Sequence, residues 1–193
     1  MLPAILAEHI HLIDLSHVSR DDIGLEAGSG HHHSSSLGYG LGRILRQIGV
    51  ARSDCILDLG CGKAGAIIAL SAFPFRRIDG VDISAALVRV AKRNLARLRI
   101  SRGDLYWSDA RDFNQLDCYT HIFMYNPFPD NVMSAVMCSL AESLRQEPRK
   151  FTLIYRNPLY HDTVASSGLF DDVLEFNPPG KNHTHVYVHT PEA

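Results

Sequence analysis

Two acidic residues and a set of glycines form the part of the sequence whose residue types and spacing could do chemistry. Asp58 lies within a short apolar run, two residues before the first of the glycines Gly60, Gly62 and Gly65. Glycine is needed where the backbone takes a positive φ or comes close to a ligand. A second acid, Asp82, follows the glycines by about 20 residues, where a carboxylate holds the ribose in nucleotide-binding βαβ units. The spacing therefore predicts a turn that binds a nucleotide-like ligand.

These residues need a strand, a tight turn, a helix and a second strand to position them. The apolar run 55–59 predicts the first strand, and segment 64–73, rich in Ala, Ile and Leu, predicts a helix packed on a sheet. Residues 77–81 predict the second strand, which ends directly before Asp82. A glycine-rich turn that binds nothing is the alternative. The register of strand, glycines, helix, strand and acid favours a ligand site over that alternative.

The remaining sequence predicts an α/β domain with a mostly parallel sheet and helices on both faces. A short turn joins the last two expected strands, so they should pair antiparallel as a hairpin at one edge. We expect an N-terminal extension and loop over residues 1–36, favoured as a helix over 1–15, and one ligand-binding domain over residues 37–193. Further strands are expected at 104–107, 120–125, 151–155, 172–176 and 184–189, and further helices at 37–48, 85–98, 131–144 and after Tyr160.

Acidic and amide side chains stand at the expected carboxyl ends of the parallel strands, where ligands bind in open sheets. A dinucleotide would place its pyrophosphate against the first glycine turn, where Asp58 would repel it. S-adenosylmethionine suits this edge better because it has no phosphate and carries an ammonium and a sulfonium group. Asp58 would then hold the ammonium end, Asp82 would accept from the ribose hydroxyls, and Asp109 would accept from the adenine amino group.

At these residues the chain resembles the class I S-adenosylmethionine-dependent methyltransferases. The motifs are DLGCGKAG at 58–65, GVDIS around Asp82, SDA at 108–110 and YNPFP at 125–129, and DLGCGK with YNPFP is similar to a bacterial group within that family. The resemblance implies a Rossmann-like fold with a seven-stranded, mostly parallel sheet in the order 3-2-1-4-5-7-6 and a C-terminal antiparallel hairpin. It implies S-adenosylmethionine as cofactor, bound by Asp58, Gly60, Cys61, Gly62, Asp82, Ile83, Asp109, Ala110 and Asn126.

The NPF step within YNPFP bears on the methyl acceptor. It is similar to the Asn-Pro-Pro-aromatic signature of methyltransferases that modify amino nitrogens in bases or glutamine side chains. That resemblance implies that Asn126 orients the acceptor nitrogen, that the Pro127 carbonyl assists, and that Phe128 lies against a planar substrate. Phe128 stands where the signature has its second Pro, and Pro129 stands in the aromatic place. A proline-rich strand end that only shapes the pocket is therefore an equal alternative.

Methyl transfer is an in-line displacement that depends on alignment and exclusion of water, so the sequence need not supply a dedicated base. For a hydroxyl acceptor, His161 or a histidine of the loop His31 to His33 could serve as base. We expect residues 24–36 to form a flexible loop and no metal site, because adjacent loop histidines seldom point at one ion.

The composition of the chain indicates which binding partners and which cellular compartment to expect. The net charge of -2 gives no overall attraction to nucleic acid or anionic membrane. The basic run at 89–102 is interpreted as a solvated helix face, since no aromatic residue interrupts it, so nucleic acid is possible but not favoured. Four cysteines without C-x-x-C spacing predict reduced thiols and a cytoplasmic protein, and the N-terminal apolar run is too short for a signal or membrane span.

The sequence thus predicts a cytoplasmic methyltransferase with an acceptor of unknown class. A nicotinamide-dependent oxidoreductase and a noncatalytic module that only binds S-adenosylmethionine are the alternatives. The oligomeric state is left open.

Overall fold

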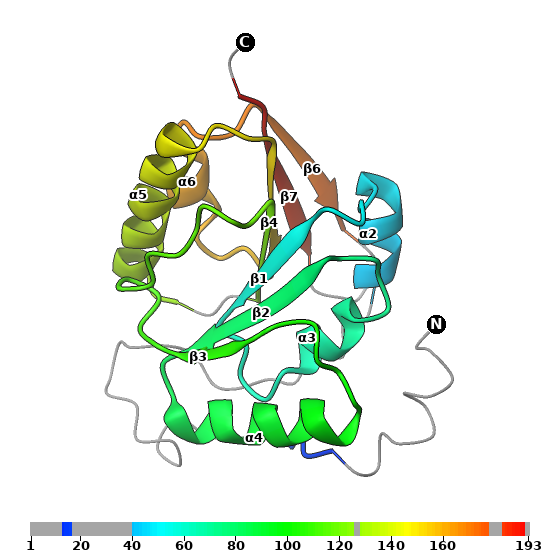
Figure 1. The fold of residues 1–193 in the computed structure, drawn as a ribbon. Coiled ribbons are helices and arrows are strands. Elements are labelled where there is room, and N and C mark those ends of the chain that lie inside the picture. Colours follow the sequence, from blue (N-terminus) through cyan, green and yellow to red (C-terminus); the bar gives the residue numbers. More distant parts are fainter. Residues whose placement is uncertain (1–12, 17–39, 126–127, 178–182, 192–193) are drawn as a thin grey trace.

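A seven-stranded sheet forms the centre of the computed structural model, which describes residues 13–16, 40–125, 128–177 and 183–191. Its strand order is β3-β2-β1-β4-β5-β7-β6. The pairs among β3, β2, β1, β4 and β5 are parallel, and β7 is antiparallel to both β5 and β6. This arrangement confirms the Rossmann-like fold and the C-terminal hairpin predicted from the sequence (Figure 1).

The bounds of the elements follow the sequence prediction closely. The strands are β1 Cys55–Leu59, β2 Arg77–Asp82, β3 Leu105–Trp107, β4 His121–Tyr125, β5 Phe151–Arg156, β6 Asp172–Phe176 and β7 Thr184–His189. The helices are α2 Leu41–Ile48, α3 Gly65–Leu70, α4 Ala85–Arg97, α5 Asp130–Gln146 and α6 His161–Ala165. Of the helix favoured over residues 1–15, only 13–15 are described and they are not helical. The loop 24–36 with His31, His32 and His33 lies outside the described residues.

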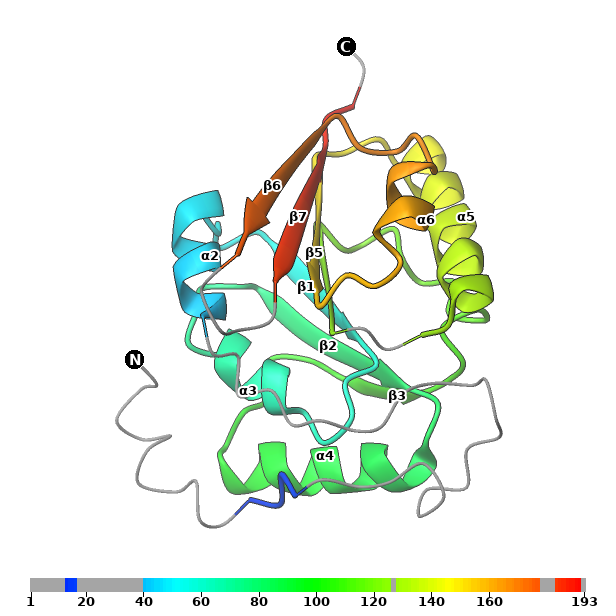
Figure 2. The same ribbon diagram turned by 180° about the vertical axis from the view of Figure 1, so that it is seen from behind.

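Helices cover both faces of the sheet and create two cores, as the two opposite views show (Figures 1 and 2). Helices α5 and α6 pack on one face with residues such as Leu57, Met133 and Tyr155. Helices α2, α3 and α4 pack on the other face with residues such as Ile56 and Ile67. Strand β1 is buried along its whole length. A strand buried on both faces is expected to be almost continuously apolar, so the carboxylate of Asp58 within it calls for a polar or charged partner.

A buried polar network around Asp79 links β2 to the segments that lead into β3 and β4. Asp79 of β2 is fully buried, and its carboxylate accepts from the Asp104 backbone N–H at 2.7 Å and from the Tyr119 hydroxyl. Arg77 Nε forms an ion pair with the same carboxylate at 2.6 Å. Burial raises the pKa of Tyr119, so its hydroxyl remains protonated and able to donate. The network fastens β2 to the approaches of β3 and β4.

Within the described residues, none of the helices combines the length and apolar character needed to cross a membrane.

Candidate functional site

The glycine turn after β1 is bonded to the end of β2. The backbone N–H groups of Gly60 and Cys61 both donate to the Val81 carbonyl at 2.9 Å. Gly60 has φ 81° and Gly62 has φ 52°, values in the left-handed region that glycine adopts without steric cost. Burial raises the pKa of the Cys61 thiol well above its usual value, so this side chain packs as an apolar group and does not act as a thiolate.

Asp82 is oriented by two backbone groups at the end of β2. One carboxylate oxygen accepts from the Gly62 N–H and the other from the Ser84 N–H, each at 2.8 Å. Burial raises the pKa of Asp82, and these two hydrogen bonds oppose that effect. Ser84 in turn caps α4 by accepting from the Leu87 N–H at 3.4 Å. The carboxylate is therefore fixed between the glycine turn and α4, with acceptor capacity left on both oxygens.

Asp58 presents an unsatisfied carboxylate oxygen in the same place. It lies in register with Gly80 of β2 and Phe123 of β4 and is only 2% exposed. Its Oδ2 is buried and has no hydrogen-bond partner among the residues that the structure describes. Burial, and then the charge of Asp82, raise the pKa of Asp58 well above its usual value. A buried carboxylate of this kind favours a ligand that brings a positive charge or a hydrogen-bond donor.

The turn's own lysine does not supply that charge. Lys63 is 3% exposed, and its ammonium group binds the Asp14 carboxylate at 2.8 Å and the Ser16 hydroxyl at 2.9 Å. The Asn94 amide of α4 donates to the carbonyls of Asp14 and Lys63 at 2.9 and 3.0 Å. Asp58 and Asp82 thus have no ion-pair partner in the described part of the chain.

Asp109 follows β3 and carries its own counter-ion. The Arg111 guanidinium reaches its two oxygens at 2.7 and 3.1 Å, and the Arg111 N–H adds a third bond at 2.8 Å. These bonds lower the pKa of Asp109 and keep it ionised. The Ser108 N–H donates to the Asp82 carbonyl at 3.1 Å, which places the SDA motif beside the end of β2.

Trp107 is a residue at this edge that the sequence did not single out. Its indole N–H donates to the Ile83 carbonyl at 3.0 Å, although the two residues are far apart in sequence. Ile83 is half-buried, and Ala110 is buried in the core on the α5 side of the sheet. The predicted cofactor residues of β1, β2 and β3 are therefore brought to one edge of the sheet.

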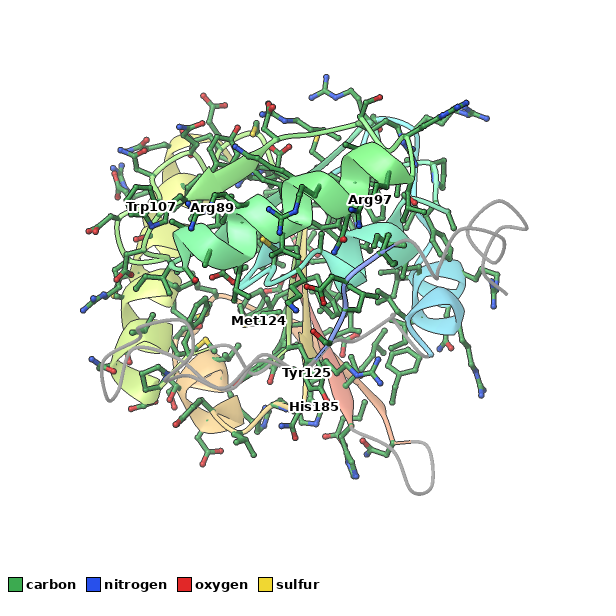
Figure 3. All side chains as sticks on the ribbon, turned by 90° about the horizontal axis from the view of Figure 1, so that it is seen from below. Arg89, Arg97, Trp107, Met124, Tyr125 and His185 are labelled. Carbon is green, nitrogen blue, oxygen red and sulfur yellow. The ribbon has the colours of Figure 1, made fainter. Side chains whose placement is uncertain are left out.

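Of the residues considered for the acceptor, Asn126 and Pro127 lie outside the described residues, and Phe128 is buried in the core beneath α5. The strand end just before them carries Tyr125. The Arg156 guanidinium lies 5.4 Å from the centre of the Tyr125 ring. Tyr125 and His185 overlap in the view from below (Figure 3), but the register aligns Tyr125 with Arg156 and His185 with Tyr155, so the two side chains lie on opposite faces of the sheet.

Two histidines and a tyrosine converge at the same edge. His161 Nδ1 lies 2.7 Å from the Tyr187 hydroxyl, and His185 Nδ1 lies 3.2 Å from His161 Nδ1 and 3.3 Å from that hydroxyl. Burial lowers the pKa of His185, which favours its neutral form near neutral pH. Burial raises the pKa of Tyr187, so its hydroxyl stays protonated. Only His161 of this triangle was a sequence candidate, because His185 and Tyr187 reach it through the hairpin.

Solved structures share this architecture. An RNA methyltransferase from Salinibacter ruber in complex with S-adenosyl-L-homocysteine is 16% identical with a TM-score of 0.57, over 79% of this chain and 92% of that one. An S-adenosylmethionine-dependent methyltransferase from Aquifex aeolicus is 13% identical with a TM-score of 0.58, over 77% and 89%. The apo form of the S-adenosylmethionine-dependent methyltransferase SibL is 16% identical with a TM-score of 0.58, over 73% of this chain but only 51% of that one, so this chain spans about half of SibL.

At these identities the likeness shows a common fold, and the cofactor named for these neighbours agrees with the one predicted here. No curated protein matches the chain by sequence. The model of a family described as "Methyltransferase domain" matches residues 56–155, just over half of the chain. This match confirms the predicted methyltransferase. The chain therefore belongs to the methyltransferase domain family.

Proposed function

We propose that this chain binds S-adenosylmethionine at the carboxyl ends of β1, β2 and β3 and transfers its methyl group to an acceptor held beyond β4 and β5. The observation that carries the proposal is the Asp58 carboxylate, whose Oδ2 is buried without a hydrogen-bond partner among the described residues. Asp82 lies close enough to raise the pKa of Asp58. A phosphate-bearing ligand would place further negative charge beside these carboxyl groups, whereas a cationic ligand would stabilise their ionised forms.

Each predicted cofactor residue that the structure describes has a role that suits its position. Asp58 would hold the ammonium end, and Asp82 would accept from the ribose hydroxyls with the lone pairs that Gly62 and Ser84 leave free. Asp109, ionised beside Arg111, would accept from the adenine amino group. The cofactor supplies a methyl group activated by its sulfonium charge. The backbone of Gly60, Cys61 and Gly62 would allow the cofactor to approach closely. Ile83 and Ala110 would form apolar walls of the cofactor site.

Binding calorimetry with S-adenosylmethionine and S-adenosylhomocysteine tests this proposal. Asp82→Ala is expected to weaken both ligands by roughly 10- to 100-fold, because hydrogen bonds to a charged group contribute about 1.5–3 kcal/mol each. The matched control is Asp104→Ala, which removes an exposed carboxylate directly before β3 that pairs with Arg77 of β2 and should leave affinity unchanged. Binding of NAD in place of these ligands, or equal affinity in the Asp82 variant, would contradict the proposal.

For the acceptor we propose an amino nitrogen positioned by the Asn126 side chain and the Pro127 carbonyl. A hydroxyl acceptor is the second candidate, favoured by the convergence of His161 and His185 on the Tyr187 hydroxyl. In that case a histidine would take the proton as the methyl group is transferred.

A methylated product is first identified by transfer of label from methyl-labelled cofactor to fractionated cell extract. Two substitutions then distinguish an amino-nitrogen acceptor from a hydroxyl acceptor. For an amino nitrogen, Asn126→Ala is expected to lower kcat by about 100-fold while cofactor affinity is retained. For a hydroxyl, His161→Asn should instead lower kcat by about 100-fold and remove the fall in rate at acidic pH. If no extract fraction accepts the label although the cofactor binds, the chain is a binding module and the transferase proposal is wrong.

A further inference from the structure

Positive charge is concentrated on one helix of this otherwise slightly acidic protein. Six basic residues and no acidic residue occur between Ile83 and Gly103, while the whole chain has a net charge of -2. Helix α4 buries Val88 and Ala91 against the sheet. We call the exposed basic residues on and just after this helix the basic face: Arg89, Lys92, Arg93, Arg97 and Arg99.

Three residues of the basic face, Arg89, Lys92 and Arg93, differ from the neighbouring Arg102, whose side chain helps to hold the fold together. The Arg102 guanidinium donates to the carbonyls of Phe73 and Phe75 at 3.1 and 2.9 Å. In contrast, Arg89, Lys92 and Arg93 form no ion pair with any residue that the structure describes. Their charges are therefore available to an external anion, and their spacing places Arg89 and Arg93 one turn apart on the helix surface.

The fold adds an aromatic platform to this charge. Trp107 at the end of β3 is 71% exposed, and its indole N–H is tied to the Ile83 carbonyl, just ahead of α4. In the projection of Figure 3, Trp107 and Arg89 appear near one end of α4 and Arg97 near the other, and the hydrogen bond to Ile83 places the indole ring near the start of the helix. A tryptophan that is both exposed and fixed by a hydrogen bond offers a ring surface whose orientation is set before a ligand arrives.

We propose that the basic face and Trp107 bind single-stranded RNA. Arginine and lysine side chains would contact the phosphates, and one base would stack on the indole ring, which is the combination that single-strand-binding proteins use. Duplexes fit less well because their bases are already stacked on each other. Arg89, Lys92 and Arg93 are not among the residues proposed to bind the cofactor or the acceptor, and Trp107 borders the cofactor site through its hydrogen bond to Ile83. The inference concerns RNA binding alone, so it holds whether or not RNA is the methyl acceptor.

The single tryptophan of the chain makes the test direct. Titration of the full-length protein with a short oligouridine at low salt should quench its fluorescence, since the base would stack on that ring. With a fluorescein-labelled oligouridine, anisotropy should show an affinity that falls steeply with salt. The double variant Arg89→Glu/Arg93→Glu is expected to bind at least tenfold more weakly and with a shallower salt dependence.

Matched variants separate this surface from general charge and from folding defects. Trp107→Leu should weaken binding by about tenfold and Trp107→Phe much less, because phenylalanine still stacks. Charge reversal at two exposed arginines of α2, Arg43→Glu/Arg46→Glu, changes the net charge equally and should leave affinity unchanged. An unchanged circular dichroism spectrum and melting temperature would show that each variant is folded. The RNA-binding result does not depend on whether methyl transfer to RNA occurs.

Three outcomes would overturn the inference. One is an absence of oligouridine binding at low salt. Another is an equal loss of binding in the α2 and α4 double variants, which would mean that only net charge matters. The third is preferential binding of duplex RNA, of single-stranded DNA or of vesicles containing phosphatidylserine, which would assign the basic face to a different partner.

Discussion

Asp58→Asn is expected to stabilise the ligand-free protein while removing most of its affinity for S-adenosylmethionine. The wild-type carboxylate is buried beside a second acid, with one oxygen lacking a hydrogen-bond partner among the described residues. A neutral amide of the same shape removes that charge, so the free energy of unfolding should rise by about 2 kcal/mol. The same change removes the anion that we propose for the ammonium group, and the affinity should fall by about 100-fold.

The pH dependence gives this prediction a definite sign. Because the pKa of Asp58 is raised in the folded protein, the folded state binds this proton more tightly than the unfolded state does. Its contribution to stability is therefore full below the unfolded pKa of about 3.9 and is lost as the pH rises through the higher folded value. Urea unfolding across this pH range should show the difference between wild type and Asp58→Asn increasing with pH.

Asp82→Asn is the contrasting variant for this experiment. The Asp82 carboxylate accepts from two backbone N–H groups, and an amide can accept with only one of its two ends. This variant should therefore lose stability without ligand, where Asp58→Asn gains it. Equal destabilisation by both substitutions would show that the Asp58 carboxylate is satisfied in solution, and the proposed cation site would lose its support.

Gly80→Ala is expected to displace the glycine turn of the proposed cofactor site, because Gly80 of β2 packs directly against that turn. A Cβ atom at Gly80 would lie 2.7 Å from Ile67 Cδ1, 2.8 Å from Cys61 Cβ and 2.8 Å from Leu105 Cδ2. The Ile67 and Leu105 methyl groups can move at modest cost, but Cys61 Cβ is attached to the turn that bonds to β2. We expect a loss of about 1–3 kcal/mol in the free energy of unfolding and a loss of about tenfold or more in cofactor affinity.

Two further variants make the Gly80 test specific. Gly42→Ala in α2 brings its new Cβ no closer than 3.4 Å to Phe73, and should be neutral or slightly stabilising in a helix. Adding Ile67→Val to Gly80→Ala removes one of the three close contacts. Stability should then recover in part while affinity for S-adenosylhomocysteine, measured by calorimetry, stays low. Full recovery of affinity would show that Ile67, and not displacement of the turn, causes the defect.

The parts of the fold that the sequence predicted are those governed by neighbouring residues. The strand, the glycines and Asp82 follow one another along the chain, and Arg111 stands two residues from the Asp109 that it binds. The ends of the strands could also be predicted from the sequence, because apolar runs stop at polar residues or proline.

The parts that the sequence did not reveal depend on contacts between distant segments. No aromatic residue occurs within the basic run, and Trp107 lies beyond its end in the chain and reaches Ile83 only through the pairing of β2 with β3. The buried acid pair depends on the parallel register that places the end of β1 beside the end of β2. Neither local propensity nor residue spacing carries that information.

Lys63 places an ammonium group within the same turn that is proposed to hold the cofactor, and Asp14 keeps that group occupied. The pKa of Asp14 is lowered to about 2, chiefly by its hydrogen bond from Lys63, so the pair persists across ordinary acidic conditions. A chain shortened to begin at α2 would lose both Asp14 and Ser16, the two side chains that bind the Lys63 ammonium group. Residues that precede the predicted domain therefore help to fix the lysine of the proposed cofactor turn.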